Sequence, residues 1–413
     1  MTGRRSLFVR WCVWLAALAL PAAARAQTLP AGPIEFADGH VTIAGDVSAG
    51  YGSDDTGAYF NYTDYNHSAL RLLRVDLSAQ AKANEHFAVL AEIRTENTDS
   101  IEPYALYVRV RPWKDRDFDI QAGRIPPTFG AFARRTYPSD NPLIGYPLAY
   151  QYLTSLRPDS IPASADELLR RRGLGWRDAF AIGNQTPDHG VPLVTAFRWD
   201  TGVQVHAATA SNLVSGAVAV TAGTLSNPRV SDDNSGRQWA GRLELRPVAG
   251  LVIGGSVARG AWVADEASKA AVGVADTGQF TQTVWGADVE YSRDHYVLRN
   301  ETIVSAWTLP GVSRPVVPQP LRAIATSFEG RYKIVPGLYA AARIDRLGFS
   351  DVTGSTTTLP WDVPVTRIEV GPGISIQRNL LLKLVYQHDS RDGGPAFLVQ
   401  REHQLAFQLV YWF

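Results

Sequence analysis

Hydrophobic and polar residues alternate one by one along most of the chain beyond residue 40. In residues 73–82, for example, Leu73, Val75 and Leu77 alternate with an arginine, an aspartate and a serine. The same pattern returns in residues 87–96, 285–291, 324–332, 367–374 and 380–387. Successive side chains of a strand point to opposite faces, so this period of two predicts amphipathic β-strands. Helical periodicity is confined to the neighbourhood of residues 165–172.

Short and long connections alternate between these segments. Short turns are predicted near residues 83–85, 113–117, 247–250, 292–295, 335–337 and 377–379, and long loops near 52–66, 224–236, 261–279, 308–320, 349–363 and 389–396. Transmembrane barrels have this arrangement, with short turns at one end and long loops at the other. The sequence offers 17 candidate strands. Joining residues 193–199 to 203–209 through a bulge at 200–202 gives 16, an even number that returns both ends of the barrel to one side.

A soluble β-sandwich or propeller is the main alternative, because it too contains alternating strands. The apolar faces of its strands would meet in a core, whereas here nearly every polar face carries arginines and acids in comparable number. Such faces suit a water-filled lumen surrounded by a lipid-facing apolar surface. A closed barrel is also the only sheet that crosses lipid without unpaired backbone. We therefore predict an all-β fold, a transmembrane antiparallel β-barrel of about 16 strands within residues 27–413.

The first residues predict a secreted precursor. Arg4, Arg5 and Arg10 precede an apolar stretch, and Ala24-Arg25-Ala26 forms a small-residue cleavage site, so residues 1–26 are expected to be a signal peptide. Removing its four arginines leaves 36 basic against 40 acidic residues, a net charge of −4. Nothing in this balance suggests nucleic acid as a partner. The only cysteine, Cys12, lies in the signal, so neither a disulfide nor a cysteine metal site is expected.

The last residues predict an outer-membrane location. Leu405, Phe407, Leu409, Tyr411 and Phe413 alternate with mostly polar residues. A terminal phenylalanine on an aromatic-rich strand resembles the signature of bacterial outer-membrane barrels. That resemblance implies that the barrel assembly machinery recognises the strand ending at Phe413 and that outer-membrane lipid surrounds the barrel.

A long insertion at residues 126–191 follows the fifth strand, which is predicted at 118–124. Residues 122–130, Ala-Gly-Arg-Ile-Pro-Pro-Thr-Phe-Gly, resemble the strand-to-loop motif of the porin superfamily, in particular porins of the phosphate-selective type. Residues 241–256, 332–343 and 367–387 show the same loose resemblance to these porins. The resemblance implies a 16-stranded barrel, usually trimeric, whose third loop folds inward. Phosphate-selective members have lysine-lined pores, whereas this chain has five scattered lysines, so phosphate selectivity does not carry over.

Arginines are abundant on the polar faces near the insertion and within it. Guanidinium groups bind carboxylate and phosphate and attract anions, so we expect a constriction in which arginines face acids across the pore. Its candidate residues are Arg74, Arg94, Arg109, Arg111, Arg124, Arg134, Arg135, Arg170, Arg171, Arg172, Glu92, Glu96 and Glu167. Each arginine could equally pair with a lumen acid to hold the wall together. A second charged set, which includes Glu301, Glu329, Arg343, Arg367 and Glu369, is expected to be structural.

No catalytic site, metal site or cofactor is predicted. The eight histidines are dispersed, and neither an HExxH nor a GxSxG motif occurs. Barrels with an adhesive or structural role tend to be smaller and plugged, so the length and the single long insertion favour a channel. We predict a porin that lets small hydrophilic solutes diffuse passively with a weak preference for anions. The alternative is an outer-membrane barrel with an adhesive, structural or hydrolytic role and no open pore. A homotrimer is expected from the resemblance alone.

Overall fold

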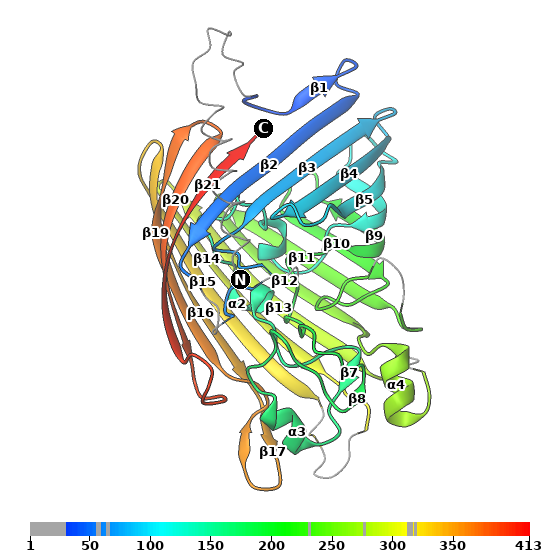
Figure 1. Ribbon diagram of the computed structural model, residues 1–413. Helices are drawn as coiled ribbons and strands as arrows, with labels where there is room; N and C mark the ends of the chain where they lie inside the picture. The colour runs from blue at the N-terminus through cyan, green and yellow to red at the C-terminus, as the bar shows by residue number, and fades with distance from the viewer. Residues whose placement is uncertain are drawn as a thin grey trace. The chain divides into compact units, whose positions relative to one another are not determined.

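Sixteen antiparallel strands close on themselves to form a barrel (Figure 1). The computed structural model describes residues 30–54, 59–62, 67–229, 233–275, 278–311, 317 and 320–413. The predicted signal peptide, residues 1–26, lies outside the described residues. The strands of the barrel are β2 (Val41–Gly52), β3 (Leu73–Lys82), β4 (Phe87–Glu96), β5 (Glu102–Val110), β6 (Phe118–Ile125), β9 (Asp200–Ala208), β10 (Val214–Thr221), β11 (Gln238–Val248), β12 (Leu251–Ala261), β13 (Thr281–Arg293), β14 (Tyr296–Trp307), β15 (Leu321–Val335), β16 (Leu338–Phe349), β19 (Val365–Gln377), β20 (Leu380–Arg391) and β21 (Arg401–Trp412).

The last strand closes the barrel against the first. β21 pairs with β2 from Asp46↔Trp412 to Gly52↔Ala406, and the backbones of Gly45 and Phe413 exchange two hydrogen bonds of 3.0 Å. A Cβ on Gly45 would lie 2.6 Å from the Phe413 ring, so this glycine leaves room for the terminal aromatic side chain. The short strand β1 (Ile34–Phe36) pairs with the start of β2 beside this seam.

The alternation of the sequence separates an apolar outer surface from a charged inner one. In β16, Ile344 is 48% exposed, whereas its neighbour Arg343 is 1% exposed. Trp239, Trp285 and Phe328 are exposed in the same way on other strands. Apolar side chains outside and buried charges inside are the reverse of a soluble sheet protein and the arrangement of a transmembrane barrel.

Short turns and long loops lie at opposite ends of the barrel (Figure 1). At the short-turn end, Gly250 has φ +82° and a Cβ there would collide with the carbonyl of Ser292, so only glycine fits between β11 and β12. At the other end lie α4 (Asp265–Val272) and the hairpin β17 (Asp351–Thr353) with β18 (Thr358–Pro360). No helix among the described residues is long and apolar enough to span a membrane.

The number of strands is confirmed, but one step in its prediction was wrong. Residues 193–199 are not the first half of a bulged strand; they lie outside the sheet, and β9 begins at Asp200. The insertion therefore extends from residue 126 to 199 rather than 191. Leu193, Val194 and Phe197 are all buried. Their segment packs between the rest of the insertion, where the Val194 amide donates to Ala149, and the wall, where Gln282 donates to the Leu193 carbonyl.

Candidate functional site in the barrel lumen

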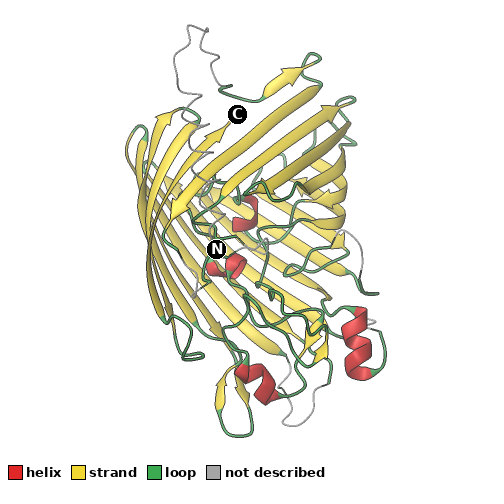
Figure 2. Cartoon of the chain, viewed as in Figure 1, coloured by secondary structure: helices red, strands yellow, loops and turns green. Residues whose placement is uncertain are grey.

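The insertion enters the lumen: Figure 2 shows helical segments within the ring of strands, while other helices lie at the loop end of the barrel. It contains η1 (Phe132–Arg134), α2 (Leu148–Gln151), β7 (Ser160–Ile161), α3 (Ala165–Arg170) and β8 (Ile182–Gly183). Phe129, Tyr150, Leu156 and Leu168 belong to its apolar core and are fully buried. The predicted inward path of the third loop is therefore present.

The entry of the insertion into the lumen depends on a glycine. Gly130 has φ +77°, and a Cβ at this position would lie 2.9 Å from the carboxylate of Glu301. That carboxylate, on β14, accepts hydrogen bonds from the amide of Ala131 (2.7 Å) and the hydroxyl of Tyr150 (2.8 Å). Glu301 thus fixes both the first turn of the insertion and the helix α2.

A second buried carboxylate holds the middle of the insertion. Glu369 on β19 accepts hydrogen bonds from the amides of Ile144 (3.1 Å) and Gly145 (2.8 Å). Arg343 on β16 donates to Glu369 at 2.5 Å and to the carbonyl of Gly145 at 2.7 Å. A Cβ on Gly145 would lie 2.8 Å from Glu369, so the backbone needs glycine to approach the wall this closely.

Cations of the wall bind the carbonyl groups of the insertion. The ammonium of Lys383 on β20 donates to the carbonyls of Pro138 (2.5 Å), Asn141 (2.6 Å) and Leu143 (3.1 Å). Arg367 donates to the carbonyl of Tyr146 at 3.0 Å and pairs with Asp389 at 2.8 Å. Arg367 was expected to be structural, whereas Lys383 was noted only as one of five scattered lysines. Their contacts show that both fasten the insertion to the wall.

Two of the predicted pore arginines have a similar anchoring geometry. Arg74 and Arg94, both 1% exposed, share the carboxylate of Asp76 at 2.7 and 2.5 Å. Arg74 also donates to the Tyr146 hydroxyl at 2.7 Å, and Arg94 lies over the Tyr104 ring at 3.3 Å from its centre. Arg74 thus ties Tyr146 of the insertion to β3, whereas Arg94 joins β4 to Asp76 on β3 and to Tyr104 on β5.

The predicted acids differ in their surroundings. Glu92 is buried and accepts a hydrogen bond of 2.7 Å from the Tyr137 hydroxyl. Glu96 is also buried, at the loop end of β4. Glu167 belongs to α3 and accepts from the amides of Ala163 and Ala181 at 2.7 and 2.9 Å, which orders the local backbone. The structure does not bring these three carboxylates together as one group opposite the arginines.

The remaining predicted arginines are spread over the length of the barrel. Arg109 is half-buried and donates to Gln80 at 3.1 Å, whereas Arg111 is exposed at the short turn after β5. Arg124 pairs with Leu106, which is 57% exposed, so Arg124 lies on the outward face of the sheet and not on the lumen face. Arg135 remains beside the lumen; its guanidinium contacts Glu329 at 3.2 Å. The side chain of Arg134 lies outside the described part of the chain.

Arg170, Arg171 and Arg172 lie at the loop end of the barrel, far along the insertion from Arg135. Arg170 is exposed, and Arg171 contacts Asp178 at 3.4 Å. Burial lowers the pKa of Arg172, an effect that the nearby charge of Asp362 opposes. Burial raises the pKa of Asp178 to about 7, because its carboxylate has lost water and gains little from Arg171. These groups lie apart from the arginines that share Asp76 and from the contact between Arg135 and Glu329.

Three solved structures illustrate what the fold resembles. An OmpF of Salmonella typhi in complex with daunomycin has TM-score 0.55 and 11% identity, covering 92% of this chain and 100% of its own. The outer membrane channel DcaP of Acinetobacter baumannii has TM-score 0.51 and 11% identity, again covering 92% and 100%. An anion-selective porin from Comamonas acidovorans has TM-score 0.52 and 9% identity, covering 90% and 99%.

Sequence comparison alone does not assign the chain to a family. No family model matches it, and neither does any curated protein. The structural matches extend over nearly the whole barrel although their identities are 9–11%, so they concern the fold. The chain has the fold of Gram-negative outer-membrane porins, a closed barrel whose apolar surface suits the bacterial outer membrane.

Proposed function

We propose that the protein is an outer-membrane porin through which small hydrophilic solutes diffuse passively, with a weak preference for anions. The observation that carries this proposal is the fixed position of the insertion inside a 16-stranded barrel, where we expect it to narrow the lumen. Carboxylates and cations of the wall hold it there through Glu301, Glu369 and Lys383. The similarity of the fold to an outer membrane channel and to an anion-selective porin adds support.

The anion preference rests on which part of the charged network is accessible. Arg135 and Arg299 contact one oxygen of Glu329 at 3.2 and 2.9 Å. Their side chains are 19% and 17% exposed, whereas that of Glu329 is 4% exposed. A passing solute would therefore meet guanidinium groups before this carboxylate, which favours anions. Glu290, with a side chain 37% exposed, contacts Arg299 and keeps the preference weak.

Single-channel recording in a planar bilayer under a KCl gradient tests the proposal. The purified barrel should give stepwise conductance with a reversal potential that favours chloride. Arg135→Gln should shift that potential towards potassium, because it removes an accessible positive charge from the lumen. The matched control is Arg293→Gln at the exposed end of β13, which should leave the reversal potential unchanged. Stepwise conductance that favours potassium in the wild-type protein would keep the porin and refute the anion preference.

A barrel without an open pore is the second candidate. It is favoured by the complete burial of lumen-facing side chains such as Lys383, Gln387 and Asp389 beneath the insertion. An adhesive, structural or hydrolytic role would then replace diffusion. A folded, heat-modifiable barrel that gives no conductance steps in the recording above would reject the porin in favour of this candidate.

The proposed assembly is a homotrimer inserted by the barrel assembly machinery. The seam between Phe413 and Gly45 supports the second part, since the terminal residue takes part in barrel closure. Native mass spectrometry of the detergent-solubilised protein should give three chains per particle. Phe413→Ala should reduce the yield of the folded, heat-modifiable form in cells, as expected if the terminal aromatic is recognised.

A further inference from the structure

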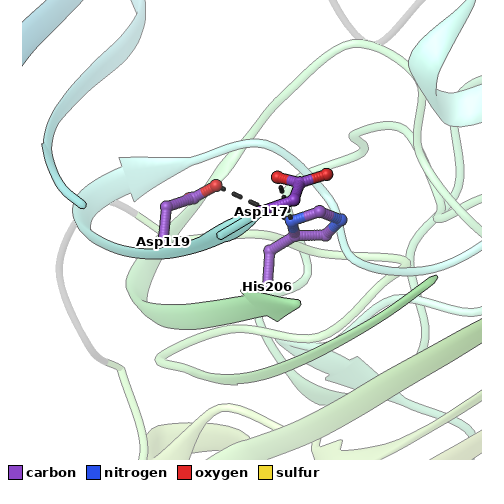
Figure 3. Close-up of side chains that lie close together, drawn as sticks. All are labelled: Asp117, Asp119 and His206. Atoms are coloured by element: carbon purple, nitrogen blue, oxygen red, sulfur yellow. Dashed lines mark ion pairs between the residues drawn. The ribbon is translucent and has the colours of Figure 1, made fainter. Parts of the chain in front are cut away.

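Two aspartates and a histidine converge at the short-turn end of the barrel (Figure 3). Asp117 lies in the turn before β6, Asp119 on β6 and His206 on β9. The Nδ1 atom of His206 lies 3.8 Å from a carboxylate oxygen of Asp117 and 3.7 Å from one of Asp119. Among the residues that the structure describes, this is the one such group of possible metal ligands.

The backbone places these three side chains together without any special loop. Asp117 and Asp119 are two residues apart, so they point to the same side of an extended chain. His206 is the cross-strand partner of Asp119, and the amide of Ala208 donates to the carbonyl of Asp117 at 2.8 Å. Directly opposite residues of an antiparallel pair have neighbouring side chains. The convergence is therefore fixed by the ladder.

We propose that Asp117, Asp119 and His206 bind a divalent transition-metal ion of the zinc type. Two carboxylates and one imidazole supply oxygen and nitrogen ligands and leave further positions for water, whereas magnesium and calcium prefer oxygen ligands alone. The ligand atoms lie within 4.8 Å of one another. A zinc ion with ligand distances of about 2.1 Å would separate them by roughly 3.4 Å, so small side-chain movements complete the site.

The surroundings of Asp119 support this assignment. Asp119 is 5% exposed, and Gln121 donates to its other carboxylate oxygen at 2.8 Å. That contact orients the oxygen nearer His206, as outer hydrogen bonds orient metal ligands in general. Arg109 on the neighbouring strand β5 donates to Gln80 and also lies near enough to Asp119 to attract its carboxylate. Two carboxylates with a neutral imidazole carry charge −2, which a divalent ion neutralises.

This proposal differs from the sequence-based expectation, which included no metal site. The sequence gives no sign of it, because His206 follows Asp119 by 87 residues and only strand pairing unites them. It is also independent of the proposed channel, since metal binding is measured on the folded barrel whether or not the barrel conducts.

Calorimetric titration of the untagged, chelator-treated barrel with ZnCl2 tests the site. We expect one zinc ion per chain, with affinity reduced at least tenfold in His206→Gln and in Asp117→Asn. Asp117 lies in an exposed turn, so its variant tests the site even where His206→Gln fails to fold. His86→Gln is the matched control, because His86 is an exposed histidine at the same end of the barrel.

X-ray absorption at the zinc edge supplies a second readout, and it should show oxygen and nitrogen ligands with one imidazole per ion. Wild-type protein that binds no stoichiometric zinc would overturn the proposal. So would unchanged affinity in both site variants, or an equal loss in the His86→Gln control.

Discussion

Replacing Lys383 by methionine should release the middle of the insertion without unfolding the barrel. The ammonium is fully buried, and it is the shared donor to the carbonyls of Pro138, Asn141 and Leu143. Methionine fills a similar volume but donates nothing. The three carbonyls would then lose their charged partner while still confined between the insertion and the wall.

The expected magnitude follows from these three contacts. A hydrogen bond to a charged group contributes about 1.5–3 kcal/mol, so the three together contribute roughly 4–9 kcal/mol. Removing the lysine also removes the several kcal/mol that its burial costs. The net loss of local stability is therefore about 3 kcal/mol, which increases the open population of this segment roughly a hundredfold.

Hydrogen–deuterium exchange with mass spectrometry measures this population directly. Peptides covering residues 137–147 should exchange about a hundred times faster in Lys383→Met, because local opening governs the exchange of their amides. Lys333→Met, which changes an exposed lysine of β15, should leave these peptides protected. Unchanged protection in Lys383→Met would refute the anchoring role. Equal acceleration in all strands would instead identify a global loss of stability.

Two further predictions concern the loop end of the barrel. Trp361→Ala should lower the temperature of heat modification by removing about 3–5 kcal/mol, since Trp361 is fully buried against Trp307. Phe397→Ala, at a 74% exposed position in the loop before β21, should have little effect. The raised pKa of Asp178 means that the stability of the wild-type protein falls as the pH rises from about 4 to about 7, the pKa of this carboxyl in the folded protein. Asp178→Asn should therefore raise that temperature more at pH 8 than at pH 4.5, and an equal change at both pH values would contradict this.

Local patterns allowed most of the barrel to be predicted. The period of two in segments such as 73–82 and 380–387 predicted strands that the structure contains, because alternation of faces is a property of each strand alone. Turn residues such as Gly250 and Gly337 marked the short connections for the same reason. The inward course of the insertion was predicted from the resemblance to porins.

The candidate site was less predictable, because its geometry depends on distant parts of the chain. The alternation of polar and apolar residues predicted that Arg74 and Arg94 face the lumen. It did not reveal that Asp76 contacts both of them or that Tyr146 contacts Arg74. Arg124 has a polar side chain, yet its register puts it on the outward face. Lys383 lies among leucines and was noted only as one of five scattered lysines.

The sequence by itself determined which segments become strands, which faces carry charge and where the chain turns, since each depends on neighbouring residues. Tertiary structure decided which charges meet. Lys383 binds carbonyls at least 240 residues away, Glu369 binds amides more than 220 residues away, and His206 meets Asp119 across a strand pair. Such contacts depend on register and closure of the whole sheet, and one residue of shift reverses every side chain.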